Sequence, residues 1–556
     1  MSARNSSQVF ALEKSVALSL CESIGSPRAL TVWMMVSYGE WDQLIKLTCD
    51  PTNYDSAQSF SDDYQVTEIL KKNPRLPLSH DKRAIALEKF KEAEVSCAET
   101  NDRILGAIKN HQFGDPLISR TLFRAIELIR SILGPLTRAD LSYCEDHFGF
   151  GPGVTTSLKG RVTYANKYKS RPIDASPRVV DFAVHCRPPG WRALNELTIR
   201  SYSKLTTVPK NAKTDRCICV EPDLNIFVQR GIGRLLRYRL SRFGLDLNDS
   251  WRRNQDLARE GSIRDDLATV DLSAASDSIS REIVWLMLPD RWSDLLYFAR
   301  TDQYLDPTDG SVKEFHKWSS MGNGYTFELE SLIFYSLACA ASEVVSMPTT
   351  DVLAFGDDII IPSAALDVLV RTLNFLGFKV NADKTFGKGL FRESCGADFF
   401  RGTPVRPLYL RSSSEYLEEV CYIYANSIRA TAHRTMCGVG CDVRYLPAWL
   451  RCYTTVKPSH RYRIPYGIGD VGFVSNLDEA APGYRHIRMK HGIYHFRCVG
   501  WHSRAFCDDM DGAYSAALNH QLPPFSYGEE IGRNPKRTWL DKRGTSVSWP
   551  NLGPWL

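Results

Sequence analysis

The sequence lacks any apolar run long enough to cross a membrane. Its longest nearly apolar stretch is Ser331 to Ala341, well short of the roughly 20 residues that a membrane-spanning helix needs. Glu13 and Lys14 stand where a secretory signal peptide would have its apolar segment. We therefore expect a cytosolic protein that has no membrane partner.

Cysteine is scarce and shows no pairing pattern. The 15 Cys among 556 residues include no C-x-x-C pair, which favours reduced thiols in the core over a disulfide framework. The group most like a metal site is His433, Cys437 and Cys441. It lacks a convincing fourth ligand, so zinc there is only an alternative.

Two common nucleotide-binding motifs are also missing. The glycine run at residues 149–153 is neither G-x-G-x-x-G nor a P-loop. Gly387 and Lys388 are followed by Gly389, where a P-loop needs Ser or Thr. If the protein binds nucleotides, we expect it to use another architecture.

Charge of one sign is not in large excess, since 69 Lys and Arg against 64 Asp and Glu leave a net charge of +5. Residues 204–242 nevertheless hold nine basic residues against three acids, and residues 484–506 hold five against none. In the second segment aromatic residues stand between the basic ones. This pattern suits a path for a phosphate backbone whose bases stack, although a solvated basic surface remains the simpler alternative for either segment.

Most of the chain has the composition of a globular protein, with 43% hydrophobic and 24% charged residues. Its length predicts several subdomains. Amphipathic helices are expected at Arg83–Ala98 and Leu117–Leu133.

The segment from residue 266 to residue 411 has a clear order of elements. A strand is predicted at Leu267–Leu272, and helices at Ile279–Leu288 and Thr326–Ala341. Two apolar runs, Val352–Phe355 and Ile359–Ile361, flank Gly-Asp-Asp and predict a β-hairpin. A helix ending at Gly377 and a strand at Phe378–Val380 follow. This order predicts an antiparallel sheet with helices on one face.

Three aspartates can meet at one edge of that sheet. Asp271 ends the first strand, and Asp357 and Asp358 lie in the hairpin. Three adjacent carboxylates repel one another unless cations neutralise them. Mg²⁺ prefers oxygen ligands and bridges carboxylates to phosphates, and two ions about 3.5 to 4 Å apart would stabilise an in-line phosphoryl transfer. A solvated Asp-Asp turn is the alternative.

Several segments together resemble one family. The segments are ATVDLSAASDSIS, SSMGNGYTFELESLIF, FGDDIIIPS and FRESCGADFFRG, preceded by TVPKNAKTDRCICVEP and GLDLND. They are similar to motifs A, B, C and E, and to upstream segments, of the RNA-dependent RNA polymerases of leviviruses, the small RNA bacteriophages. The similarity is strong over residues 206–411 and weak at the termini.

This resemblance implies an α+β fold of the right-hand polymerase type, with an antiparallel palm sheet of ferredoxin-like type. Residues 1–265 would form the N-terminal region and fingers, residues 266–415 the palm with a finger insertion at about 289–318, and residues 416–556 the thumb and C-terminal region. The chain would be the catalytic β-subunit of a phage replicase in the cytoplasm of an infected bacterium. It would copy single-stranded RNA from nucleoside triphosphates without a primer.

The resemblance also assigns roles to residues near the predicted sheet. It implies that Asp271, Asp357 and Asp358 bind two Mg²⁺ ions, for which Mn²⁺ is a possible substitute. Lys384 would be the general acid for the leaving pyrophosphate, with an exposed turn lysine as the alternative. The basic finger residues over the nucleotide entry path would be Lys210, Lys213 and Arg216, where Arg can hold phosphate with two hydrogen bonds.

Further nucleotide contacts are expected from Gly322, Asn323 and Asp277. Asp277 can accept a hydrogen bond from a ribose 2′-hydroxyl, and the alternative is that it caps the next helix. Two positions depart from the family pattern: Phe355 replaces the usual tyrosine, and Glu330 stands where many RNA polymerases have Asn. We expect activity to survive the first change and the ribose-sensing contacts to differ because of the second.

Partners and competing functions complete the expectations. In the basic and aromatic segment at residues 484–506, Arg485, Arg488 and Lys490 are predicted to bind RNA. The resemblance implies host elongation factors Tu and Ts and a ribosomal protein as partners, which no residue shows independently. A reverse transcriptase, a catalytically silent RNA-binding scaffold and a metal-dependent nuclease are the alternative functions.

Overall fold

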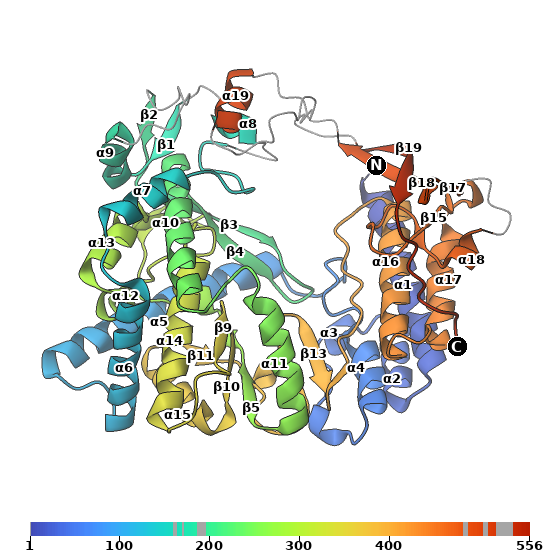
Figure 1. Ribbon diagram of the computed structural model, residues 1–556, viewed down its shortest axis with the longest axis horizontal. Coiled ribbons are helices and arrows are strands. Elements are labelled where there is room, and N and C mark those ends of the chain that lie inside the picture. Colours follow the sequence, from blue (N-terminus) through green and yellow to red (C-terminus); the bar gives the residue numbers. More distant parts are fainter. Residues whose placement is uncertain are drawn as a thin grey trace.

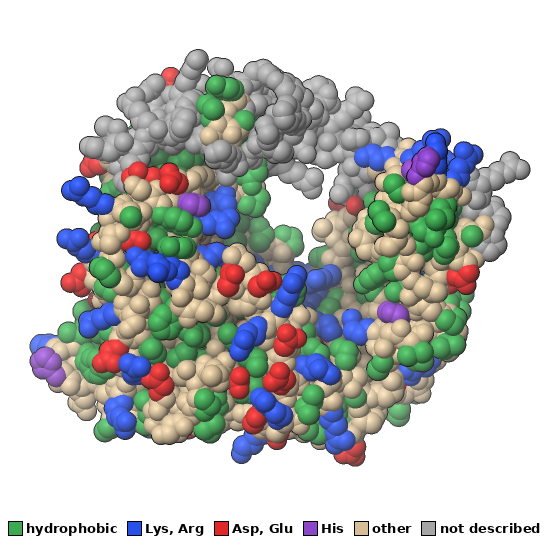
Figure 2. All heavy atoms as spheres, in the orientation of Figure 1, with side chains coloured by type: hydrophobic (Ala, Val, Ile, Leu, Met, Phe, Trp, Pro, Cys, Tyr) green, Lys and Arg blue, Asp and Glu red, His purple; other side chains and the backbone are tan. Residues whose placement is uncertain are grey.

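A computed structural model describes residues 2–158, 164–168, 172–185, 196–481, 487–503, 510–518 and 537–556. Helices and short, mostly antiparallel sheets follow one another along the chain, so the predicted α+β class is confirmed. Two sides rise from a common base (Figure 1). Figure 2 shows a hollow between these two sides.

Helices make up the first part of the chain. Asp81 and Asp115 cap α5 and α6 by accepting hydrogen bonds from the first free backbone N–H groups. Both predicted helices are confirmed, and the first runs on to Asn110. The elements are α1 (Ser2–Ile24), α2 (Pro27–Tyr38), α3 (Trp41–Leu44), α4 (Ala57–Glu68), α5 (Lys82–Asn110), α6 (Pro116–Leu133) and α7 (Arg138–Asp146).

The next part carries an antiparallel hairpin and two long helices. In the hairpin Val208 lies opposite Arg216, and the sheet continues in the order β4-β3-β7-β8. The elements are α8 (Tyr164–Tyr168), β1 (Ile173–Ala175), α9 (Pro177–His185), β2 (Leu197–Ile199), β3 (Tyr202–Pro209), β4 (Asp215–Val220), α10 (Asp223–Arg242) and α11 (Ser250–Arg264), with β7 (Gln303–Leu305) and β8 (Val312–Glu314) later in the chain.

A three-stranded antiparallel sheet with the order β5-β10-β9 lies in the base of the molecule. The predicted hairpin is formed by β9 (Leu353–Phe355) and β10 (Asp358–Pro362), and β10 also pairs with β5 (Leu267–Val270). The predicted helix and strand that follow are α15 (Leu366–Phe375) and β11 (Lys379–Val380). β11 pairs with β6 (Leu272–Ser273) rather than joining the three strands.

Helix α14 (Thr326–Val344) occupies the larger hydrophobic core, with buried residues on every face. It contacts α6, α10 and the strands of the hairpin. A helix that is apolar all round is typical of a buried core position, so the predicted helix is confirmed. The neighbouring elements are α12 (Arg281–Met287), α13 (Asp290–Ala299), β12 (Phe391–Ser394), β13 (Ala397–Phe400) and β14 (Thr403–Pro404).

A second core joins the two ends of the chain. Helix α1 packs against α16 and α17, and buried residues of all three belong to one cluster. The first helices therefore share a core with the C-terminal part, while the division at residues 265 and 415 stays a prediction. The C-terminal elements are α16 (Leu417–Thr435), α17 (Leu446–Thr455), β15 (Arg463–Ile464), β16 (Phe473–Val474), α18 (Leu477–Ala480), β17 (Arg488–Lys490), β18 (Ile493–Ser503), α19 (Met510–Leu518) and β19 (Arg537–Ser546).

The tip of the β3–β4 hairpin bridges the hollow to this second core. Ala212 at the tip is fully buried in the second cluster, although the hairpin itself belongs to the other side. Its backbone N–H donates to the carbonyl of Lys71, 3.3 Å away. The hairpin therefore fixes the N-terminal helices to the side of the molecule that carries α10.

Candidate active site

Strand pairing brings the three predicted aspartates to one edge of the sheet β5-β10-β9. Ile359 of β10 pairs with Val270 of β5 in antiparallel register. Asp358 and Asp271, each one residue beyond this pair, consequently lie next to each other. Asp357 lies in the turn between β9 and β10.

Gly356 makes this turn possible. Its φ is 61°, a left-handed conformation that favours glycine. A Cβ there would lie only 2.8 Å from Cε2 of Phe327 and 3.0 Å from Oε1 of Glu330. The glycine of the Gly-Asp-Asp motif therefore lets the hairpin press against α14.

The carboxyl groups at this edge are incompletely neutralised. Burial and the neighbouring Asp357 raise the pKa of Asp358 to about 7. Burial also raises the pKa of Asp271, against the opposing effects of Lys384 and of a hydrogen bond from Asn381. Such groups favour a bound cation, and their oxygen donors suit Mg²⁺. In the described part of the chain, no three His, Cys, Asp or Glu side chains are already grouped to hold one ion.

Asn381 and Glu393 are neighbours of this edge that the sequence did not single out. Asn381 donates its Nδ2–H to Oδ2 of Asp271 at 2.8 Å and its backbone N–H to the Asp271 carbonyl at 2.9 Å. Glu393 Oε1 lies 3.8 Å from Nζ of Lys384. Glu393 belongs to the segment FRESCGADFFRG, which resembles motif E. This resemblance is the feature of the sequence that could have indicated a place for Glu393 near the site.

The side chain of Lys384 is half exposed, and the charges of Asp271 and Asp358 act on it. Burial lowers its pKa, but Glu393, Asp271 and Asp358 outweigh that effect and the pKa is raised. The ammonium group therefore stays protonated at neutral pH, which a general acid requires. Its role stays a prediction.

The basic finger residues lie on the β3–β4 hairpin and separate into two environments. Burial and Arg216 lower the pKa of Lys210, while Asp357 acts in the opposite direction. Burial and Lys71 lower the pKa of Lys213. Lys210, beside Arg216, is thus in the field of Asp357, whereas Lys213 is nearer Lys71 and Glu68 of the N-terminal part.

Lys72 is a further cation that the sequence did not reveal. Its Nζ lies 3.8 Å from the centre of the Tyr409 ring. Burial and Arg406 lower the pKa of Lys72 to about 8, and Lys384 lowers it further. The N-terminal part of the chain therefore contributes charge to the same region.

Asp277 is held by a buried lysine. Its Oδ1 accepts from Nζ of Lys317 at 2.8 Å and from Oγ of Ser320 at 3.2 Å. Asp277 lies in a 3₁₀ turn, Ala275–Asp277, and the cap position of α12 is Ser280. The capping alternative is therefore wrong, while ribose sensing stays a prediction.

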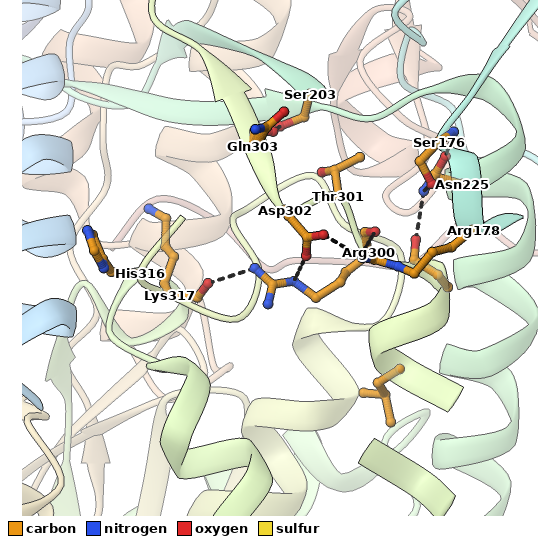
Figure 3. Close-up of polar contacts among 12 residues, drawn as sticks. Ser176, Arg178, Ser203, Asn225, Arg300, Thr301, Asp302, Gln303, His316 and Lys317 are labelled. Carbon is orange, nitrogen blue, oxygen red and sulfur yellow. Dashed lines mark hydrogen bonds and ion pairs between the residues drawn. The ribbon is translucent and has the colours of Figure 1, made fainter. Parts of the chain in front are cut away.

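The loop that carries Lys317 is held by Arg300, which belongs to a polar network with Asp302 and Arg178 (Figure 3). Arg300 is almost fully buried and donates from Nη2 to the carbonyl of Lys317 at 3.1 Å. Asp302 lies 3.7 Å from Nε of Arg300 and accepts a hydrogen bond from Arg178. This network holds the Lys317 backbone beside the first turn after β6.

The glycine-rich loop before α14 approaches the β3–β4 hairpin closely. A Cβ at Gly322, whose φ is 118°, would lie 2.2 Å from the carbonyl oxygen of Cys219. Asn323 accepts a hydrogen bond from the N–H of Tyr325 at 3.0 Å, and its Nδ2 is buried without a hydrogen-bond partner among the described residues. A direct nucleotide contact by either residue stays a prediction.

Glu330 lies where a different polar residue was expected. It is buried and accepts a hydrogen bond from Oγ of Ser276 at 2.7 Å. Burial raises its pKa to about 8, and Asp357 adds to the effect. Glu330 is thus mostly protonated at neutral pH and can donate a hydrogen bond.

Two of the predicted RNA-binding residues, Arg488 and Lys490, lie on the edge strand β17, away from the sheet β5-β10-β9 (Figure 1). Arg488 and Lys490 are exposed and, two residues apart on one strand, share a face of the sheet β17-β18-β19. Arg485 lies outside the described residues. On the packed face, Phe496 contacts Trp549.

Two of the three candidate zinc ligands, His433 and Cys441, make other contacts. A hydrogen bond joins Nδ1 of His433 to the carbonyl of Gly440, and the buried Cys441 thiol lies 3.6 Å from the carbonyl of Leu552. No grouping of these three side chains to hold a metal is found in the described ranges.

Of the helices that the structure describes, none has the length and apolar character to cross a membrane.

Comparison with known proteins identifies relatives along most of the chain. The family model of the RNA replicase beta-chain matches residues 11–471. The RNA-directed RNA polymerase subunit beta of Escherichia virus Qbeta is 37% identical over 451 residues, which cover 80% of this chain and 75% of that protein. The corresponding subunit of Enterobacteria phage SP is 37% identical, over 83% and 78% of the two chains. The RNA-directed RNA polymerase beta chain of Escherichia phage MS2 is 34% identical, over 72% and 74%.

Proposed function

The chain belongs to the RNA replicase beta-chain family and is an RNA-directed RNA polymerase subunit, and we propose that Asp271, Asp357 and Asp358 form its catalytic metal site. The main support is the β5–β10 register, which sets Asp358 beside Asp271 at the hairpin edge. These carboxylates would hold two Mg²⁺ ions, or Mn²⁺ as a substitute. When bound, such ions stabilise the attacking and leaving oxygens of a phosphoryl transfer.

The side chains around the aspartates orient the nucleotide. Lys210, Lys213 and Arg216 attract the triphosphate along the β3–β4 hairpin. Gly322, Asn323 and Asp277 lie on the side where the sugar would sit. Lys384 carries a proton on Nζ that it can give to the leaving pyrophosphate.

The substrates of the reaction are an RNA template and nucleoside triphosphates. We infer that the template is the single-stranded genome of an RNA phage, copied without a primer in the cytoplasm of the infected bacterium. Residues 266–415 would be the palm of a right-hand polymerase, between fingers in residues 1–265 and a thumb in residues 416–556. Arg485, Arg488 and Lys490 would contact RNA outside the palm.

The catalytic assignment is tested by replacing one carboxylate at a time. We expect Asp357→Asn and Asp271→Asn to abolish nucleotide incorporation, because a lost metal ligand removes several kcal/mol of transition-state stabilisation. Binding of single-stranded RNA and the melting temperature should change little. The matched control is Asp383→Asn, which removes an exposed carboxylate next to Lys384. Substantial incorporation by Asp357→Asn in Mg²⁺ would contradict the proposal.

The competing functions give different results in the same assay. A reverse transcriptase would extend RNA templates with deoxynucleotides, a scaffold would bind RNA without incorporation, and a nuclease would shorten it. Host elongation factors Tu and Ts and a ribosomal protein are proposed partners. Purification of tagged chain from an expressing bacterium, with identification of copurifying proteins and measurement of polymerase activity, tests that proposal.

A further inference from the structure

The basic segment at residues 204–242 is not a uniform surface. Arg237 donates two hydrogen bonds to Oε1 of Glu328, at 3.0 and 2.6 Å. Arg239 contacts both oxygens of Asp140 at 2.7 Å. These two arginines therefore already form ion pairs with carboxylates of the protein.

Arg230 and Arg234 lie on the same helix, α10, and differ from these two arginines in their contacts. Among the described residues neither forms an ion pair, and Nη1 of Arg230 is buried without a hydrogen-bond partner. Arg234 is exposed. Arg230 as a whole is half-buried, and a buried donor such as its Nη1 that lacks a partner is unfavourable. An acceptor oxygen from outside the fold would supply the missing hydrogen bond.

Other cations lie close to Arg230, and the carboxylates in reach are occupied. Burial and Arg230 lower the pKa of the buried Lys167 to about 8. Glu328, whose charge reaches Arg230, is already bound by Arg237. Asp223, whose charge reaches Lys167, accepts hydrogen bonds from Thr155 and from the backbone of Asp174. The cluster of Lys167, Arg230 and Arg234 is therefore short of negative charge.

The cluster borders the glycine-rich loop that leads into α14. A Cβ at Gly324 would lie 3.0 Å from the backbone nitrogen of Arg230, and the N–H of Gly324 donates to Oε1 of Gln229 at 3.0 Å. On the other side, a Cβ at Gly151 would be 4.0 Å from Cδ of Arg230. The loop therefore packs directly against the backbone of α10 at Arg230, and Gly151 places no side chain against Cδ of Arg230. Figure 2 shows Lys and Arg side chains next to the hollow at the level of α10.

We propose that Arg230 and Arg234, with Lys167 behind them, bind phosphate groups of the template RNA strand beside the loop at residues 322–324. The two arginines are one helical turn apart, about 6 Å along the axis, so they can contact successive phosphates of an extended strand. A phosphodiester offers several acceptor oxygens, and guanidinium matches them in a planar, two-point contact. The ligand is polynucleotide rather than nucleotide, because the charge of Asp357 acts on Lys210 of the β3–β4 hairpin and not on Arg230.

The inference rests on the polymerase function only for the identity of the ligand, so the test uses binding without catalysis. The variants are Arg230→Gln, Arg234→Gln and the double variant. The control is Arg242→Gln, which removes an exposed arginine from the far end of α10. Fluorescence anisotropy with a labelled single-stranded RNA is measured from about 50 to 300 mM KCl.

We expect the slope of log K against log salt to fall by about 0.7 for each lost phosphate contact, and therefore by about 1.4 in the double variant. Arg242→Gln should keep the wild-type slope. Arg230→Lys should keep most of the slope, because it retains the charge while losing the planar contact. A variant that loses thermal stability without a change of slope would reduce Arg230 to a packing role and overturn the inference.

Nucleotide kinetics distinguish a second way in which the inference can fail. A raised KM for nucleoside triphosphate at unchanged RNA affinity would assign the cluster to the nucleotide and overturn the template assignment. A different outcome is a smaller slope of log K for RNA against log salt in the variants while the wild-type chain incorporates no nucleotide. That result would support the RNA contact and contradict the catalytic proposal. The two proposals are thus judged by separate measurements.

Discussion

Nζ of Lys317 lies 2.8 Å from Oδ1 of Asp277 and 3.2 Å from Oε1 of Glu94, with the lysine fully buried. Burial lowers the pKa of Lys317, but the two carboxylates outweigh it and the pKa is raised. The lysine therefore joins the turn after β6 to helix α5. Asp277 is held in one orientation by this pair, which favours a role in recognition over a freely moving surface carboxylate.

This pairing sharpens the test of ribose sensing. We expect Asp277→Ala to reduce the preference for ribonucleotides over deoxynucleotides, since the variant loses the carboxylate that would accept from the 2′-hydroxyl, and a hydrogen bond to a charged group contributes about 1.5 to 3 kcal/mol. Steady-state incorporation with matched nucleotide pairs gives the ratio. The control is Glu94→Ala, which removes the other partner of Lys317. It should lower the melting temperature while leaving the ratio unchanged. An unchanged ratio in Asp277→Ala would make the aspartate purely structural.

Lys384 is expected to act through its proton and not through its charge alone. Lys384→Ala should reduce the rate of incorporation by roughly 10²- to 10⁴-fold, the usual range for general acid catalysis. Lys384→Arg keeps the positive charge but not an easily released proton, so it should restore nucleotide binding without restoring the rate. The pH dependence of the rate constant of incorporation, measured under single-turnover conditions, tests whether the proton of Lys384 is required.

A matched control for Lys384 lies four residues away. Lys388→Ala removes an exposed lysine from the same loop and should leave the rate close to that of the wild type. If Lys384→Arg proves as active as the wild type, the lysine serves only as a counter-charge for Glu393 and the aspartates. The exposed-turn alternative would be supported by a wild-type rate in Lys384→Ala.

The outer strand β17 is predicted to hold RNA through phosphate contacts. Replacing Arg485, Arg488 and Lys490 with Ala should weaken binding to RNA of any sequence and lower the salt slope by about one unit for each lost contact. A double variant, Lys109→Ala with Arg120→Ala, removes exposed charge from α5 and α6 as a control. A salt slope equal to that of the control would reassign the segment to a solvated surface.

Sequence patterns predicted the β9–β10 hairpin and helix α14 because the residue patterns that define them lie within short segments. The two apolar runs that flank Gly-Asp-Asp and the apolar helix that begins at Thr326 can be recognised without a distant partner, and both the hairpin and the helix are observed. The adjacency of Asp271 and Asp358 followed from placing both at strand ends. The capping role for Asp277 was wrong because α12 begins at Arg281, three residues later than a cap at position 277 requires.

Contacts between distant segments could not be predicted in this way. The position of Lys72 beside Tyr409 and that of Glu94 beside Lys317 depend on tertiary packing. Nothing in the first helix indicated that it shares a core with α16 and α17. Likewise, the nine basic residues of the segment at 204–242 looked equivalent until the fold paired Arg237 and Arg239 with carboxylates and left Arg230 without one.

A buried carboxyl group remote from the palm aspartates makes stability depend on pH. Glu221 accepts hydrogen bonds from Gln229 at 3.2 Å and from Thr301 at 3.2 Å. Burial raises its pKa from 4.5 to about 7, although these hydrogen bonds act in the opposite direction. The folded protein therefore holds this proton over a pH range in which the unfolded chain has released it.

The sign of the effect follows from proton linkage. The contribution of Glu221 is fully present below pH 4.5 and is lost as the pH rises to about 7. At 1.36 kcal/mol per pKa unit the loss is about 3 kcal/mol. Glu221→Gln is neutral at every pH and keeps one acceptor oxygen for Gln229 and Thr301. Relative to the wild type, its melting temperature should therefore improve between pH 5 and pH 8. Glu92→Gln, which replaces an exposed carboxyl, should show no such trend, and equal trends in the two variants would mean that Glu221 is ionised in the folded protein.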